Sequence, residues 1–148
     1  MTDAKQWVDR LNPEIPELTP QQLMEDILWY VQHYDWVSLV ELAHRYGDLG
    51  KGDHSLTIEP SLNIILWTGM SEKLVTAIIQ LVHNREIHIH PGSFLAYMID
   101  GGGLRLPLAK RAPKGGYKEP HWLPVSIRNG PFCGLKHCPA RSKPVLAK

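Results

Sequence analysis

The segment NIILWTGMSEKLVTAIIQLVHNREIHIHP, residues 63–91, decides the fold that we expect for this chain. Residues 59–69 are interpreted as a short helix that ends at Gly69, and Ser71 can cap a second helix two residues later. Residues 87–90 alternate strictly between apolar and polar side chains, which predicts a strand, and a Pro-Gly turn closes it. The segment therefore predicts two helices joined by a tight glycine turn and followed by a strand.

Two further helices are predicted before this segment. Thr19 and Gln22 have the spacing of a capping box, and apolar residues then recur at helical intervals. Asp35 can cap the next helix, which Gly47 ends. Residues 55–58 alternate as a short strand would.

A hairpin is expected after the segment. Residues 94–99 form a second strand candidate, residues 100–103 (Asp-Gly-Gly-Gly) make a strong turn, and residues 104–106 resume the alternation. The predicted elements are thus helices combined with a small antiparallel sheet, an α+β fold.

This order of elements, carried by residues 63–91 and the glycine-turned strands after them, resembles the winged helix-turn-helix family over about residues 20–108. The resemblance implies that the second helix of the pair lies in a DNA major groove and that the β-hairpin forms the wing. The chain then divides into an irregular lead-in (1–18), a winged-helix domain (19–108) and a basic, extended C-terminal arm (109–148).

Charge is divided unevenly along the 148 residues. Residues 1–100 carry 6 Lys and Arg against 14 Asp and Glu, whereas residues 101–148 carry 10 Lys and Arg against one acid, Glu119, a balance of +9. The second part also holds 7 of the 12 prolines and 7 of the 12 glycines, a composition typical of loops. The acidic part would repel nucleic acid in bulk, and the basic part would attract a polyanion.

Composition excludes several classes of protein. A hydrophobic content of 43% argues against disorder, two cysteines do not make a disulfide scaffold, and no apolar run is long enough to cross a membrane. Since the N-terminus also lacks the pattern of a secretory signal, we expect a cytoplasmic protein that does not enter a membrane.

The candidate nucleic-acid-binding residues begin with the outward face of the helix after Gly69. Gln and Lys side chains can read base edges, and a serine at a helix N-terminus can meet a phosphate. This face carries few cations, so a solvated or protein-binding face remains the alternative reading. The residues of the face are Ser71, Lys73, Thr76, Gln80 and His83.

The wing and the arm complete this set. His88 and His90 share one face of the predicted strand, and cations follow the wing closely, with Tyr117 or Trp122 able to stack on a base. Docking within the chain or onto a partner, or a merely solubilising tail, are the other readings. The cations are Arg105, Lys110, Arg111, Lys114 and Lys118.

Two groups of residues are candidates for metal binding. His88 and His90 are a possible ligand pair without a third ligand at a defined spacing, and a polar wing face is the preferred reading. Cys133, His137 and Cys138, with His121 upstream, could make a four-ligand zinc site, but their spacing is not that of a zinc knuckle and free thiols are expected instead. The sequence predicts no metal, no cofactor and no catalytic residue.

Among the five tryptophans, Trp29, Trp36 and Trp67 are expected to build the core. Trp7 and Trp122 lie in the irregular ends and are expected to pin those ends onto the body.

We expect a protein that acts without catalysis. The leading hypothesis is nucleic-acid binding, as a transcription regulator or as a small subunit of a nucleoprotein assembly. The alternative is a protein-interaction adaptor whose acidic body docks onto a basic partner while the arm folds on binding. A metal-dependent hydrolase that uses the histidines is a distant third, and the nucleic acid, the partner and the oligomeric state stay open.

Overall fold

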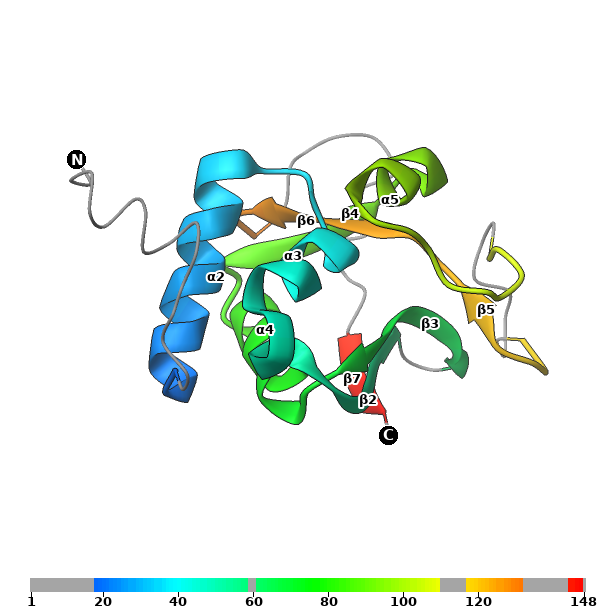
Figure 1. The fold of residues 1–148 in the computed structure, drawn as a ribbon, viewed down its shortest axis with the longest axis horizontal. Coiled ribbons are helices and arrows are strands. Elements are labelled where there is room, and N and C mark those ends of the chain that lie inside the picture. Colours follow the sequence, from blue (N-terminus) through cyan, green and yellow to red (C-terminus); the bar gives the residue numbers. More distant parts are fainter. Residues whose placement is uncertain (1–17, 59–60, 110–116, 132–143, 148) are drawn as a thin grey trace.

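Four α-helices and two small β-sheets make up the part of the chain that the structure describes, which confirms the α+β class (Figure 1). The structure is a computed structural model, and it describes residues 18–58, 61–109, 117–131 and 144–147. One sheet has three strands in the order β1-β6-β4, and the other has four in the order β5-β3-β2-β7. We call them the three-stranded and the four-stranded sheet.

Helix α2 (Pro20–Tyr34) forms as the sequence predicts. The Thr19 side chain accepts a hydrogen bond from the Gln22 backbone N–H, and the Gln22 side-chain oxygen accepts one from the Thr19 backbone N–H, so the capping box is complete. Leu23, Ile27 and Val31 are buried along one face of the helix.

Helix α3 (Leu39–Tyr46) begins later than expected. Its N-cap is Ser38, whose hydroxyl accepts from the Glu41 N–H, and Asp35 instead ends α2 with a positive φ of 48°. The prediction of Asp35 as the cap was wrong because the intervening residues are used in a sheet: strand β1 (Val37–Ser38) pairs with β6. A short 3-10 turn, Gly47–Gly50, follows α3.

The largest difference from expectation lies between Gly50 and Ser71. Strand β2 (Lys51–Ile58) and strand β3 (Ser61–Met70) form an antiparallel pair, so the expected helix over residues 59–69 was wrong. Alternate residues of β3, Ile64 and Leu66, are 1% and 0% exposed, which is the period of a strand. A short apolar run fits either period, and here pairing with β2 decides it.

Gly69 therefore does not join two helices. It lies near the end of β3, and its φ of +72° is a conformation that glycine adopts without strain. The prediction that the backbone at Gly69 favours glycine is thus confirmed, but the prediction that Gly69 lies in a helix-helix turn was wrong.

Helix α4 (Glu72–His83) and strand β4 (Ile87–Pro91) confirm the second half of the deciding segment. Ser71 caps α4 by accepting from the Leu74 N–H, and α4 buries an apolar face that includes Val75 and Ile78.

The expected hairpin after β4 is replaced by a helix. Helix α5 (Phe94–Asp100) begins after the N-cap residue Ser93 and ends at Gly101. Residues 104–106 form no strand. The strand prediction for residues 94–99 was wrong because those caps and the anchoring of Tyr97 favour a helix. Strand β4 pairs instead with β6 (Val125–Asn129), which lies more than thirty residues further along the chain.

The C-terminal residues that the structure describes belong to both sheets. Strand β5 (His121–Trp122) pairs with β3, β6 lies in the middle of the three-stranded sheet, and β7 (Pro144–Ala147) pairs with β2. Figure 1 shows β7 beside β2 although the two are far apart in sequence. These residues were expected in an extended arm, but backbone pairing holds them in the fold.

Tryptophan positions follow from this topology. Trp122, 1% exposed, lies in the core, where its indole N–H donates to the Leu66 carbonyl at 3.2 Å, so its expected pinning role is confirmed. Trp67 packs against the core and Trp29 is half-buried, but Trp36 is 47% exposed and its expected core position was wrong. Trp7 lies outside the described residues.

Candidate functional site

The face of α4 predicted to read DNA lines a groove against α2. The groove has a volume of about 450 Å³. It brings three predicted residues together with two apolar side chains of α2. The lining residues are Pro20, Met24, Glu72, Lys73, Thr76, Ala77 and Gln80.

Two polar side chains in this groove, Lys73 and Gln80, already have partners. The Lys73 ammonium donates to the Leu18 carbonyl at 3.0 Å, and the Gln80 amide donates to Asn84 at 2.9 Å. Ser71 is occupied by capping α4. Lys73 is the only cation that lines the groove among the described residues, and Glu72 opposes it, so the groove carries little positive potential.

The remaining predicted residues are dispersed. His83 is exposed at the end of α4, while Arg105 and Lys118 are exposed in other parts of the chain. Lys110, Arg111 and Lys114 lie outside the described residues, as do Cys133, His137 and Cys138.

His88 and His90 lie on β4, on the same face of the three-stranded sheet, as the alternation predicts. No hairpin wing surrounds them, and His88 is only 2% exposed. The Nδ1 atom of His88 lies 2.9 Å from the Gly130 carbonyl oxygen, and Nδ1 of His90 lies 3.0 Å from that of Pro91. The Nε2 atom of each ring is buried without a hydrogen-bond partner.

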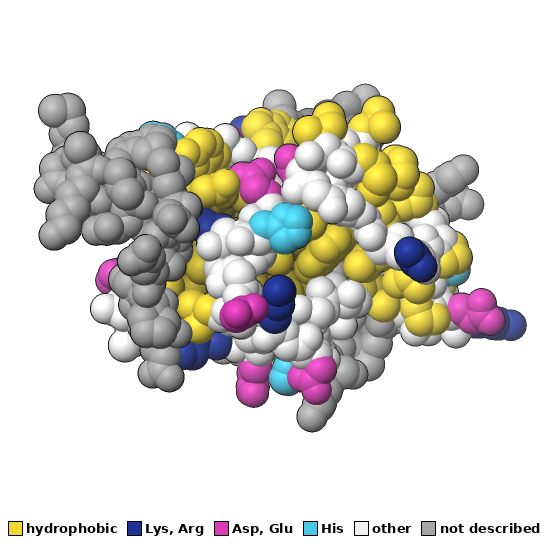
Figure 2. Space-filling model, in the orientation of Figure 1, with side chains coloured by type: hydrophobic (Ala, Val, Ile, Leu, Met, Phe, Trp, Pro, Cys, Tyr) yellow, Lys and Arg dark blue, Asp and Glu magenta, His cyan; other side chains and the backbone are white. Residues whose placement is uncertain are grey.

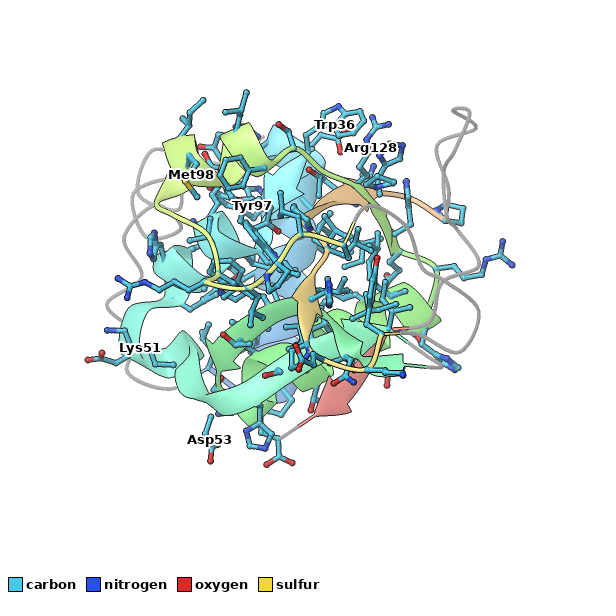
Figure 3. The ribbon with its side chains drawn as sticks, turned by 90° about the vertical axis from the view of Figure 1, so that its right-hand side faces the viewer. Trp36, Lys51, Asp53, Tyr97, Met98 and Arg128 are labelled. Carbon is cyan, nitrogen blue, oxygen red and sulfur yellow. The ribbon has the colours of Figure 1, made fainter. Side chains whose placement is uncertain are left out.

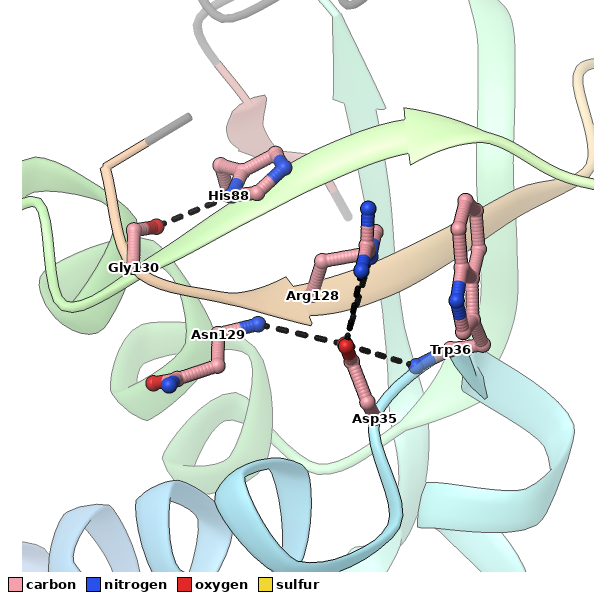
Figure 4. A network of polar contacts seen from close by, with 6 residues as sticks. All are labelled: Asp35, Trp36, His88, Arg128, Asn129 and Gly130. Atoms are coloured by element: carbon pink, nitrogen blue, oxygen red, sulfur yellow. Dashed lines mark hydrogen bonds and ion pairs between the residues drawn. The ribbon is translucent and has the colours of Figure 1, made fainter. Parts of the chain in front are cut away.

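A charged pair lies near the end of the central strand of the same sheet, β6, where Arg128 donates to both carboxylate oxygens of Asp35, at 2.9 and 3.3 Å (Figure 4). The Arg128 guanidinium also lies over the Trp36 ring, 3.8 Å from its centroid. Burial pushes the pKa of Asp35 upwards, but the hydrogen bonds from Arg128 and the Trp36 N–H outweigh it and hold that pKa below its usual value.

The seam between α2 and α3 holds the most perturbed titratable groups. Arg45 pairs with Asp26 at 2.9 Å, and the Tyr46 hydroxyl donates to the same carboxylate at 2.7 Å. Burial and the Asp26 charge raise the pKa of Tyr46, and burial together with a hydrogen bond to Glu41 raises that of Tyr30. Because these groups satisfy one another between two packed helices, the cluster fits a structural role.

Helix α5, which the sequence did not predict, has the most unusual surface of the described chain. Four of its seven residues are large apolar side chains that are exposed, from 43% for Phe94 and Met98 to 66% for Leu95 and 85% for Ile99. Hydrophobic side chains gather over this helix in Figure 2. A serine cap at 93 and a glycine stop at 101 were the signals that could have identified the helix.

The inner side of α5 is firmly anchored. The Tyr97 hydroxyl donates to the Val125 carbonyl at 2.6 Å and accepts from the Leu39 N–H at 3.1 Å, and burial raises its pKa to about 12. Asp100 accepts from the Ser38 hydroxyl at 2.7 Å. Figure 3 shows that Tyr97 points from α5 towards the interior of the molecule.

Comparison of the chain with protein-family models, with curated proteins and with solved structures finds no match in any of the three. No helix in the described ranges has the length and apolar character needed to cross a membrane. The same ranges hold no group of three or more His, Cys, Asp or Glu residues placed to bind one metal ion.

Proposed function

We propose that the protein is a non-catalytic interaction module that binds a partner protein through the outer face of α5. The observation that carries the proposal is the exposure of Phe94, Leu95, Met98 and Ile99 on a single short helix. Apolar side chains gathered in one exposed patch gain free energy when a partner covers them.

Rigid attachment of α5 supports this reading. The bonds of Tyr97 and Asp100 hold the helix on the three-stranded sheet and on the start of α3. A Cβ atom at Gly103 would lie 2.5 Å from the Trp122 ring, so the chain after α5 also follows the core closely. A surface held in place before binding loses little conformational entropy when the partner arrives.

Charge suggests the chemistry of the partner. The residues that follow α5 are strongly basic, with ten Lys and Arg against one acid in residues 101–148. A partner segment with apolar anchors and flanking carboxylates would match both the apolar face and these cations. This differs from the basic partner that the sequence suggested.

Site-specific photo-cross-linking in the native cell tests the proposal. With p-benzoylphenylalanine in place of Ile99, we expect one dominant adduct to another protein, and a second change, Leu95→Glu, should abolish it. The same photo-reactive residue in place of Gln32, exposed on α2, is the control. Equal adduct patterns at positions 99 and 32 would contradict the proposal.

Nucleic-acid binding by the basic residues is a second candidate. Arg105 and Lys118 are exposed, and the balance of +9 in residues 101–148 favours a polyanion. The resemblance to winged helix-turn-helix proteins stays a prediction, and α4 and β4 are the elements that support it. The test is a salt-dependent titration of DNA and RNA with the full chain and a variant in which serine replaces Arg105, Lys110, Arg111, Lys114 and Lys118.

This multiple variant is preferable to truncation, because removing the residues after 107 would also remove β5, β6 and β7. If the cations contact phosphates, the variant should lose affinity and each lost contact should reduce the salt slope by roughly 0.9 on duplex DNA. Equal affinity of the two proteins at low salt would contradict this second candidate.

A further inference from the structure

Two histidines of β4 each carry one buried ring nitrogen, Nε2, that makes no hydrogen bond within the described part of the chain. His88 is 2% exposed and His90 is half-buried, and the Nε2 atom of each has no hydrogen-bond partner. Leaving a buried polar atom unpaired is unfavourable, so two such atoms on alternate residues of one strand need an explanation.

The other nitrogen of each ring fixes the tautomer. A carbonyl oxygen can only accept, so Nδ1 of His88, 2.9 Å from the Gly130 oxygen, carries the proton, and Nδ1 of His90 donates in the same way to Pro91. In the neutral ring, Nε2 is then the nitrogen that has a free lone pair. A backbone carbonyl on Nδ1–H is the usual means by which proteins orient a histidine that binds metal through Nε2.

The two rings are close enough to share an ion. Their centroids lie 6.4 Å apart, with an angle of 68° between the ring planes. Two imidazoles bound to one ion at about 2.1 Å through Nε2 would have centroids roughly 5–6 Å apart, a small side-chain adjustment from this arrangement. In Figure 4 the second nitrogen of His88 points away from Gly130, along the direction of β4.

We propose that His88 and His90 supply two ligands of a transition-metal site of the zinc class. Arg128 lies opposite His88 in the sheet, and its charge is engaged by Asp35 at 2.9 Å. Imidazole is a preferred ligand of zinc, and a structural zinc ion would stabilise the three-stranded sheet.

A four-coordinate ion needs two further donors besides the imidazoles of His88 and His90. Among the described residues no third His, Cys, Asp or Glu stands close enough. In the sequence, Cys133 follows Gly130 by three residues, a length of chain that reaches at most about 11 Å. Its thiol is therefore included in the experiment as a separate arm.

The test is zinc binding by the full chain after its metal has been removed with a chelator. Competition with a chromophoric chelator should give one bound Zn²⁺ per chain, and Co²⁺ should give the visible absorption of a protein-bound ion. His88→Gln and His90→Gln should each weaken Zn²⁺ binding at least tenfold, whereas His83→Gln, at an exposed site on α4, should not.

The His90→Gln variant is included because His88 is buried, so that its substitution can disturb the fold. Circular dichroism checks that both variants are folded. Failure of the unsubstituted protein to bind Zn²⁺ would overturn the proposal, as would unchanged affinity in the two histidine variants. Binding that is lost in Cys133→Ser but kept in both histidine variants would show a thiol site without the histidines, and would also overturn it.

Discussion

Charged and apolar side chains are placed in opposite ways in two regions of the molecule, the seam between α2 and α3 and the outer face of α5. In the seam, charged groups are inside: the side chains of Arg45 and Asp26 are 4% and 14% exposed and are paired at 2.9 Å. On α5, apolar groups are outside, and Ile99 is 85% exposed. A buried charge is tolerated in the fold only while its partners stay in place, whereas an exposed apolar face gains nothing until another surface covers it.

The largest effect on stability is expected from a substitution that breaks the seam. Asp26→Ala would leave Arg45 buried without its carboxylate and Tyr46 without its acceptor, so we expect a loss of about 3–5 kcal/mol in the free energy of unfolding, measured with urea. The control is Asp48→Ala, which removes the exposed pair with Lys51 and should leave stability unchanged. A loss at Asp26 no larger than that at Asp48 would show that the seam is not a structural cluster.

A smaller effect is expected on the inner side of α5. Tyr97→Phe would leave the buried Val125 carbonyl and Leu39 N–H without their partner, at a cost of about 1–3 kcal/mol. Tyr34→Phe, at a side chain that is 41% exposed, is the matched control and should be neutral. Equal stabilities of the two variants would mean that Tyr97 does not anchor α5.

The partly exposed pair of Asp35 and Arg128 lies between the two extremes and should depend on pH. The pKa of Asp35 is lowered in the folded state, so its charge contributes stability above the usual pKa of about 3.9 and loses it as the pH falls through the folded value. Asp35→Asn should therefore cost about 1 kcal/mol or less at pH 7 and nothing near pH 2.

Asparagine tolerates the positive φ of this position and can still accept from the Trp36 N–H, so the variant isolates the charge. Urea unfolding at the two pH values measures the difference. A deficit that is the same at both would assign the effect to geometry rather than to charge.

The smallest effect on stability is expected on the outer face of α5. Leu95→Ser combined with Ile99→Ser should change the free energy of unfolding by no more than about 0.5 kcal/mol, because neither side chain packs in the core. In a pull-down, the variant should nevertheless no longer capture the partner that cross-linking identifies. A clear loss of stability would show that this face is part of the fold and is not a free surface.

Local signals in the sequence predicted the elements that depend on neighbouring residues. The capping box of α2, the Ser71 cap and apolar face of α4, and the alternation in β4 all involve residues within a few positions of one another. The shared face of His88 and His90 followed from the same alternation. These signals do not depend on where the rest of the chain lies.

Only the tertiary structure decided which elements pair, and therefore which surfaces are exposed. Residues 61–70 became a strand because β2 and β5 bond to them, and the Trp122 indole reaches the Leu66 carbonyl from 56 residues away. For α5, the apolar run of six residues before Asp100 fits a helix or a strand, and the hydrogen bonds of Tyr97 to Leu39 and Val125 favour the helix. The sequence alone determines local periodicity and caps, but backbone partners distant in the chain determine what a short apolar run becomes and which of its side chains stay in water.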